Sequence, residues 1–264
     1  MKRSRASVPA GVGAVAVPLL IFVIWEIMGR QSTRTASVTY PSLLWQALDL
    51  PLLGTLAVQT GYSLARLFVG STIGALAGIA TALFLWESGI ARSLGAPTLR
   101  FIAPVPVVVW IPFFILLFGL GEWCKIAVVA MCVFFMVQAF MSGALTTISN
   151  DYFEVSRIYG KGVIQRIRHV LLPSSWPVAM HGVRISLALA WVALFLVECG
   201  FSRHRQEGLG WFIANAQIFG QLEKEFLGVI VLATVAFVAD RLLHRWQLAS
   251  SRWMDTPAEL GVAR

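Results

Sequence analysis

The sequence is poor in charged residues, which make up only 13% of its 264 positions. A typical soluble domain carries roughly 25%. Cysteine is also scarce, and three cysteines in a chain of this length cannot form the disulfide framework of a small secreted protein. The chain is instead 58% hydrophobic, with a mean hydropathy of +0.76. Disordered chains lack such residues, so the composition excludes disorder and indicates an integral membrane protein.

Motifs for nucleotide hydrolysis and metal-dependent catalysis are missing from the sequence. It contains no G-x-x-x-x-G-K-[ST], because Gly160-Lys161-Gly162 lacks the glycine spacing of that phosphate-binding loop. It contains no H-E-x-x-H either, and its cysteines lack the spacing of metal ligands. We therefore expect no catalytic residue, metal or cofactor in this chain.

The formal net charge of +8 is compatible with a nucleic-acid-binding protein, but the distribution of the basic residues is not. Such a protein carries a basic patch on one face. Here Lys and Arg stand at the ends of apolar runs, as the positive-inside rule expects. The charge therefore indicates topology and attraction to anionic membrane lipid, with no nucleic-acid partner.

Apolar runs predict six transmembrane helices and hence an all-α, polytopic membrane protein. More Lys and Arg residues fall in the segments that this layout places in the cytoplasm than outside, which favours two cytoplasmic termini. The predicted spans are Pro9–Gly29, Ala57–Trp86, Phe101–Phe118, Trp123–Leu145, Pro177–Val197 and Phe226–Leu243.

Two of these spans have unusual compositions. The second carries Gly70, Gly74 and Gly78 at four-residue spacing, so all three lie on one helical face that another helix can approach closely. The third carries three prolines within Ala103–Pro112, and each removes a backbone donor and kinks or breaks a helix. A broken helix is tolerated where it is buried or lines a cavity, so this stretch is a candidate for a transport pathway or a packing kink.

The longest internal cytoplasmic segment, residues 146–176, predicts a helix–turn–helix. Gly160 suits the end of its first helix. Its second helix is expected over Val163–Leu172, with one apolar face, and Pro173 and Pro177 are expected to end it before the fifth span. That apolar face requires something to cover it.

This segment resembles the EAA loop of ABC importer permeases, whose pattern is Glu-Ala-Ala, three residues, Gly, nine residues, then Ile-x-Leu-Pro. The glutamate, the glycine and the final Leu-Pro keep their spacing here. Valine and serine replace the two alanines, and valine replaces the isoleucine. The matching positions are Glu154, Val155, Ser156, Gly160, Val170, Leu172 and Pro173.

Stretches elsewhere are similar to the group of these permeases that handles nitrate, sulfonates, taurine and bicarbonate. The resemblance extends from roughly Thr60 to Gln247. The stretches are Gly61-Tyr-Ser-Leu-Ala-Arg66, Ala103-Pro-Val-Pro106, Phe118-Gly-Leu-Gly-Glu122 and Glu207-Gly-Leu-Gly210.

The resemblance implies a permease of the type I (MetI-like) kind in the bacterial inner membrane. It implies a second permease copy, usually in a homodimer, two ATPase subunits that hold ATP and Mg²⁺, and an external solute-binding protein. The EAA loop would then be the coupling helix that docks on the ATPase. The expected organisation is a peripheral helix and outer loop (1–56), a core of five spans (57–247) and a cytoplasmic tail (248–264).

Polar residues within the spans are the candidates for a translocation pathway, because such groups are costly in lipid. They are Gln138, Glu198 and Arg66. Gln138 can equally join two helices, and Arg66 can attract anions or anchor at the headgroups. Glu198 can instead pair with Arg203 or Arg205.

Two alternatives stay open at this stage. The first is a permease for a neutral or cationic nutrient, such as a pyrimidine vitamin precursor. The second is an ATP-independent secondary transporter, which would need inverted repeats that the sequence does not display and would leave the EAA-like loop unexplained.

Overall fold

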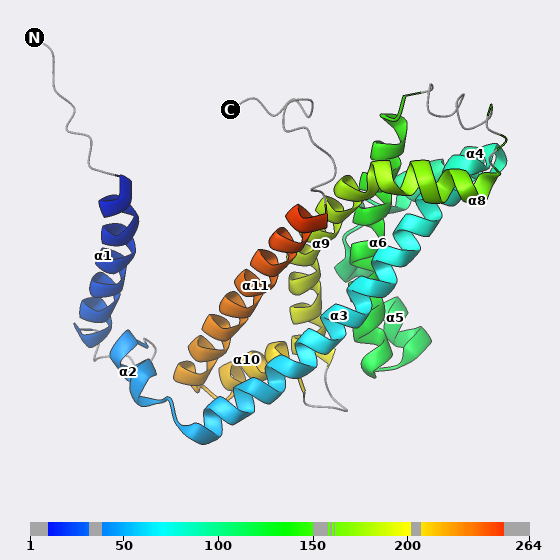
Figure 1. Cartoon of the computed structure of the whole chain (residues 1–264). Coiled ribbons are helices and arrows are strands. Elements are labelled where there is room, and N and C mark those ends of the chain that lie inside the picture. The colour runs from blue at the N-terminus through cyan, green and yellow to red at the C-terminus, as the bar shows by residue number, and fades with distance from the viewer. Residues whose placement is uncertain are drawn as a thin grey trace, which may run out of the picture.

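Every regular element among the described residues is a helix. The computed structural model describes residues 10–31, 39–149, 158, 160, 162–201 and 207–250. In chain order the helices are α1 (Ala10–Gln31), α2 (Pro41–Gln46), α3 (Leu50–Glu87), α4 (Gly89–Ile102), η1 (Val107–Trp110), α5 (Ile111–Phe118), α6 (Glu122–Thr146), α8 (Val163–Arg166), η2 (Ile167–Leu171), α9 (Leu172–Phe201), α10 (Leu209–Ile218) and α11 (Leu222–Ser250) (Figure 1).

Local side-chain signals fix both ends of the longest helix, α3. The side chain of Asp49 caps its N-terminus by accepting the Leu52 N–H at 2.8 Å. At the other end Ser88 terminates α3 and caps α4 by accepting the Ala91 N–H at 3.3 Å. With 38 residues, α3 is about 57 Å long, which exceeds the thickness of a bilayer.

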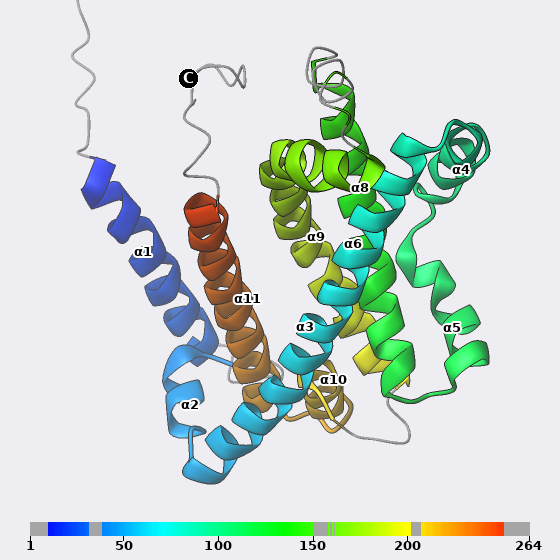
Figure 2. The ribbon, with the colours of Figure 1, turned by 45° about the vertical axis from the view of Figure 1, so that its right-hand side comes forward.

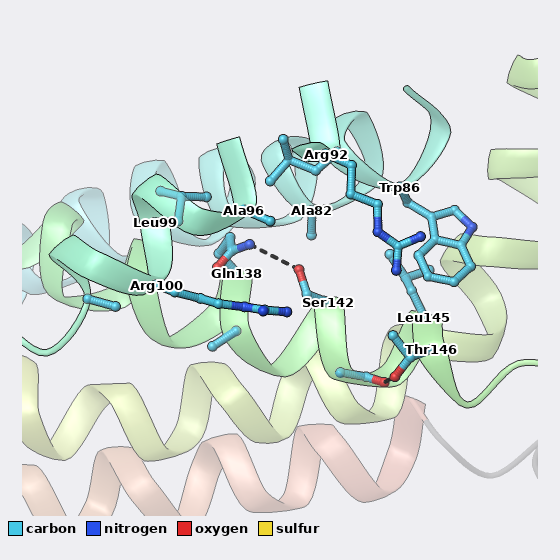
Figure 3. Close-up of a pocket in the computed structure, with 14 residues that line it drawn as sticks. Ala82, Trp86, Arg92, Ala96, Leu99, Arg100, Gln138, Ser142, Leu145 and Thr146 are labelled. Atoms are coloured by element: carbon cyan, nitrogen blue, oxygen red, sulfur yellow. Dashed lines mark hydrogen bonds between the residues drawn. The ribbon is translucent and has the colours of Figure 1, made fainter. Parts of the chain in front are cut away.

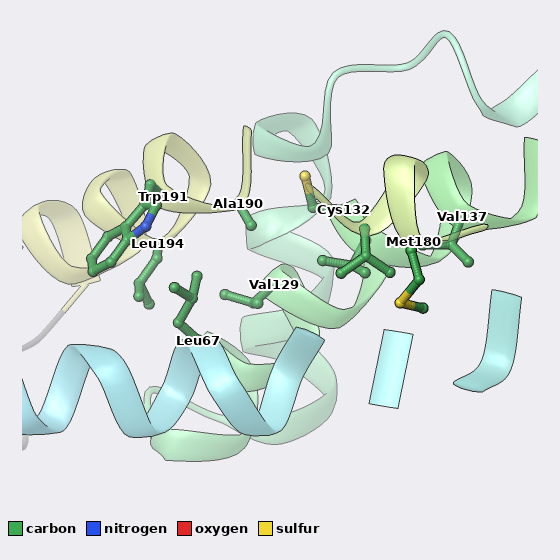
Figure 4. Packing of buried hydrophobic residues seen from close by; sticks show 10 residues of the cluster. Leu67, Val129, Cys132, Val137, Met180, Ala190, Trp191 and Leu194 are labelled. Carbon is green, nitrogen blue, oxygen red and sulfur yellow. The ribbon is translucent and has the colours of Figure 1, made fainter. Parts of the chain in front are cut away.

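The core is built where α3, α6 and α9 cross. Leu67 of α3, Val129 of α6 and Leu194 of α9 belong to one buried apolar cluster (Figure 4). Helix α6 passes very close to the glycines of α3, so that a Cβ atom on Gly74 would meet the carbonyl oxygen of Ala130. A side chain on α3 at this point would push the two helices apart.

Four helices are individually long and apolar enough to cross a membrane. They are Leu50–Glu87, Glu122–Thr146, Val163–Gly200 and Leu222–Ser250, and they contain four of the predicted spans. Most of the predicted first span lies in α1. The count of six spans and the cytoplasmic placement of both termini stay predictions.

The predicted third span, Phe101–Phe118, is not one continuous helix. Helix α4 ends at Ile102, and the chain resumes as η1 and α5 at an angle of 98° to it (Figure 2). Pro104 and Pro106 lie in this break, where their missing N–H groups remove the hydrogen bonds that would continue the helix.

The prediction that Pro173 and Pro177 end a separate loop helix is wrong. The chain stays helical from Val163 to Phe201, and Pro177 lies inside α9. A proline ring clashes with the carbonyl group one turn earlier in a regular α-helix. Here η2 (Ile167–Leu171) is a π-helical turn, and its wider bonding pattern accommodates Pro173 just after it.

Candidate functional site

The helix bundle has two ends with different chemistry. At one end, called the α10 end, α10 packs beside the start of α3 and the last turns of α9. At the other, called the α8 end, α8 lies near the close of α3 and the start of α4 (Figure 1).

A cluster of buried charges occupies the α10 end. Arg66 of α3 is 2% exposed, and its Nη1 donates to Oε1 of Glu198 on α9 at 2.7 Å. Its Nε and Nη2 donate to the two carboxylate oxygens of Glu122 on α6, at 2.6 and 2.9 Å. A single guanidinium thus joins the three central helices through charge-assisted hydrogen bonds.

The same cluster holds the beginning of α10. The backbone N–H of Gly208 donates to Oε1 of Gln59 at 2.5 Å. The N–H of Leu209 donates to Oγ of Ser63, and that of Gly210 to Oε2 of Glu198, both at 2.9 Å. The first N–H groups of a helix have no partner within it, so these contacts satisfy them and place a carboxylate at the positive end of the helix dipole.

Glycine is required at the entry to α10. Gly208 has φ +116°, a conformation that other residues rarely adopt. A Cβ atom there would also overlap the carboxyl group of Glu198, and one on Gly210 would lie 2.8 Å from the Cβ of Glu198. The Gly-Leu-Gly sequence therefore lets the backbone of α10 reach the buried carboxylate.

Two cations and three carboxylates meet at the α10 end. Lys125, also 2% exposed, lies 3.3 Å from Glu122 and provides a second cation beside Arg66. The carboxylates of Glu122 and Glu198 offset these two charges, and Glu207 lies at 3.9 Å from Arg66. Since buried charges are stable only when paired, this arrangement fixes the helices relative to one another.

A cavity of about 380 Å³ lies at the α8 end, between α3, α4 and α6. Gln138 of α6, a candidate from the sequence, lines it and donates from Nε2 to Oγ of Ser142 at 3.0 Å (Figure 3). Arg92 and Arg100 of α4 line it as well. The structure thus separates Gln138 from the other two candidates, Arg66 and Glu198, which contact each other at the opposite end.

An ion pair connects the EAA-like segment to α3. Arg166 of α8 donates from Nε to Oε1 of Glu87 at 3.0 Å, and its Nη2 contacts the second carboxylate oxygen. Both side chains are largely buried. Glu87 is the last residue of α3, and a negative charge there is unfavourable with respect to the helix dipole. The charge of Glu87 is therefore stabilised by Arg166 rather than by its own helix.

The remaining residues of the EAA-like segment are only partly described. Gly160 has φ +63°, which suits a left-handed helix end, and Val170, Leu172 and Pro173 lie on η2 and the first turn of α9. Two apolar side chains beside them, Ile158 and Ile164, are each 82% exposed. Glu154, Val155, Ser156, Arg203 and Arg205 lie outside the described residues.

Sequence reasoning missed most of the cluster at the α10 end. A signal was available, because Gln59, Ser63 and Arg66 recur at spacings of four and three within an apolar span and so share one helical face. The pairing of Glu87 with Arg166 gave no such local signal, since 79 positions separate them.

Comparisons with known proteins agree with this architecture. Residues 70–254 match the family described as "Binding-protein-dependent transport system inner membrane component". The chain is 28% identical over 242 residues to the putative aliphatic sulfonates transport permease protein SsuC of Bacillus subtilis (strain 168), covering 91% of this chain and 87% of that protein.

Two further relatives have similar coverage. The taurine transport system permease protein TauC of Escherichia coli (strain K12) is 24% identical, over 93% of this chain and 90% of its own length. The bicarbonate transport system permease protein CmpB of Synechococcus elongatus is 26% identical, over 94% of this chain and 93% of its own.

Among solved structures, a chain of the MetNI methionine ABC transporter in an inward-facing form superposes with a TM-score of 0.65. The two chains are 20% identical, and the superposition covers 77% of this chain and 99% of the MetNI chain. At this identity the likeness concerns the fold, and it confirms the predicted all-α fold of the MetI-like kind.

Proposed function

Because the chain belongs to the family of binding-protein-dependent transport system inner membrane components, and is therefore the permease subunit of an ABC importer, we propose that it carries a small oxyanion across the membrane. It is a multi-pass protein of the bacterial plasma membrane. The family match also decides against the alternative of an ATP-independent secondary transporter.

The observation that carries the proposed substrate class is the near-full-length likeness to SsuC, TauC and CmpB. The names of these three relatives refer to aliphatic sulfonates, taurine and bicarbonate. All three are small solutes with an oxyanion group. The substrate proposed for this chain is therefore a sulfonate, taurine, bicarbonate or the similarly small nitrate.

The proposed assembly is a homodimer of this chain, two ATPase subunits with ATP and Mg²⁺, and an extracytoplasmic solute-binding protein. This chain itself would not hydrolyse ATP. The exposed Ile158 and Ile164 support an ATPase dock in the EAA-like segment, because large apolar side chains gathered in one exposed segment are typical of contact surfaces. In this proposal the α8 end faces the cytoplasm, and Glu154 to Pro173 form the coupling element.

The proposed coupling route runs from this element into the bundle. Movement of α8 on the ATPase would reach α3 through the bidentate pair of Arg166 with Glu87. It would reach α9 directly, since α8, η2 and α9 are continuous. Arg66, Glu198 and Gln138 stay the proposed residues of the translocation pathway, although Arg66 and Glu198 bind each other at the α10 end.

The test is uptake by the complete importer in proteoliposomes, with ATP inside or outside and labelled taurine, ethanesulfonate, nitrate or bicarbonate as solute. ATP-dependent accumulation of one of these anions is expected. Accumulation of a cationic vitamin precursor, with none of the anions taken up, would refute the oxyanion proposal while leaving the importer assignment in place.

Coupling is tested in the same system with Gly160→Ala and Gly162→Ala. The first forces an alanine into a left-handed conformation at φ +63°, whereas Gly162 has φ −69° and open space around it. We expect Gly160→Ala and Glu154→Arg to lower uptake strongly at equal protein levels, and Gly162→Ala to leave it unchanged. Equal uptake by all three variants would argue against the coupling role.

A further inference from the structure

The cavity at the α8 end is lined by two arginines that have no acidic partner among the described residues. Arg66, Arg166 and Arg184 each contact a carboxylate. No Asp or Glu of the described residues lies within ion-pair distance of Arg92 or Arg100, although both line the same cavity. Two positive charges thus stand at one cavity with no ion-pair partner in the described part of the chain.

The arginine nearer the close of α3 is held in place by an aromatic ring. The guanidinium carbon of Arg92 lies 5.0 Å from the ring centre of Trp86. Stacking on an aromatic face leaves the N–H groups at the edge of a guanidinium available to an oxyanion, which they can bind in a bidentate manner. In Figure 3 the Arg92 and Arg100 side chains reach into the cavity from separate turns of α4.

Polar groups of α6 face the same space. The Oγ of Ser142 accepts a hydrogen bond from Gln138, so its own O–H can donate elsewhere, and the amide nitrogen of Gln138 has a second N–H. None of the described residues that line the cavity is acidic. The wall therefore offers donors and positive charge, with small apolar side chains such as Ala82 and Ala96 between them.

We propose that this cavity binds an oxyanion group, a sulfonate or a phosphate, between Arg92, Arg100 and Ser142. Its volume of about 380 Å³ suits a small ligand, and its apolar wall suits a short alkyl or glycerol chain attached to the anion. The group can come from the transported solute, which rests on the proposed function, or from the head of an anionic phospholipid, which does not.

The binding experiment uses the full-length chain in nanodiscs. In one arm the lipid is zwitterionic phosphatidylcholine and the probe is ³⁵S-labelled ethanesulfonate, measured by equilibrium binding. In the other, phosphatidylglycerol is added, and lipid retained by the released protein is counted by native mass spectrometry. The variants are Arg92→Gln, Arg100→Gln and both together. Arg241→Gln is the matched control, because Arg241 also stacks on a ring, that of Phe237, but on α11.

We expect the double variant to lose affinity by at least about tenfold in one arm, because each guanidinium contributes charge-assisted hydrogen bonds to the anion. The control should bind like the native chain. Loss confined to the first arm assigns the solute, and loss confined to the second assigns a lipid head. Unchanged binding in both arms would overturn the proposal.

Two further variants keep the test decisive if the double variant does not fold. Arg92→Lys with Arg100→Lys retains both charges but not the planar fork, and Ser142→Ala removes the hydroxyl donor. Each is expected to weaken binding by an intermediate factor, and native affinity in both would overturn the proposal. Uptake by the complete importer is measured separately. Refutation of the proposed oxyanion substrate and refutation of the proposed cavity site therefore give different results.

Discussion

Removal of the buried guanidinium at the α10 end is the sharpest test of how this bundle is held together. Arg66→Met keeps much of the side-chain volume but removes four hydrogen bonds. These run to Glu198 at 2.7 Å, to Glu122 at 2.6 and 2.9 Å, and to the carbonyl oxygen of Glu207 at 2.9 Å. The carboxylate of Glu198, 1% exposed, then loses its direct ion-pair partner, and the described cation left near it is Lys125.

The expected loss follows from that orphaned charge. Breaking one side of a buried ion pair costs about 3–5 kcal/mol, because the remaining charge stays desolvated. Glu198→Gln removes the charge instead and keeps an acceptor for Ser63 or Gly210. The variant with both changes should therefore be less destabilised than the sum of the single variants, with a coupling energy of about 1–3 kcal/mol.

The free energy of unfolding is measured by titrating the folded chain with SDS in mixed micelles and following helix content. The control is Arg30→Met, which removes a cation that is 63% exposed and paired with Glu26 one turn away on α1. Its effect should be near zero, because exposed ion pairs are screened. If Arg66→Met behaves like Arg30→Met, or if the two changes at the cluster are additive, the cluster does not clamp the helices.

Two further predictions concern the contacts of α3 along its length. Gly74→Ala should lower the free energy of unfolding by about 1–3 kcal/mol, since its Cβ would overlap the Ala130 carbonyl. The control Gly54→Ala has open space around it and should leave the free energy of unfolding unchanged. Equal effects of the two variants in the same SDS titration would refute this prediction. Glu87→Gln should cost about 1–2 kcal/mol by weakening a charge-assisted pair and should also reduce the solute carried per ATP hydrolysed. Exchanging the two charges, with Glu87→Arg and Arg166→Glu together, should restore the ratio, and no recovery would count against the pair as a coupling contact.

Local information in the sequence was sufficient to predict four of the spans and the glycine face of α3 that packs against α6. The lengths of the apolar runs predicted the four long helices, because the thickness of the bilayer sets a minimum length for a helix that crosses it. The breaks at Pro104 and Pro106 were predictable for the same local reason: a proline lacks the N–H that its helix needs.

Pairings between distant segments could not be predicted in this way. Arg66 and Glu198 are 132 positions apart, so nothing near either residue indicates its partner, and sequence reasoning offered Arg203 or Arg205 instead. Helix α10 was not predicted, because its first N–H groups are satisfied by side chains of α3 and α9 rather than by a local cap. Proline at position 173 was misjudged because a π-helical turn depends on tertiary packing around Leu171, which is fully buried.

The unbroken course of α3 has a mechanical consequence. The helix is fixed near one end by the Glu87 pair and further along by the Arg66 cluster, which lies 21 positions earlier, or about 30 Å along the continuous helix. Such a rod acts as a lever arm: pivoting by about 10° at one fixed point displaces the other by about 5 Å, given the rise of 1.5 Å per residue. In the proposed coupling mechanism, a small rotation imposed at α8 would thereby become a shift large enough to open or close a passage for a solute of a few atoms.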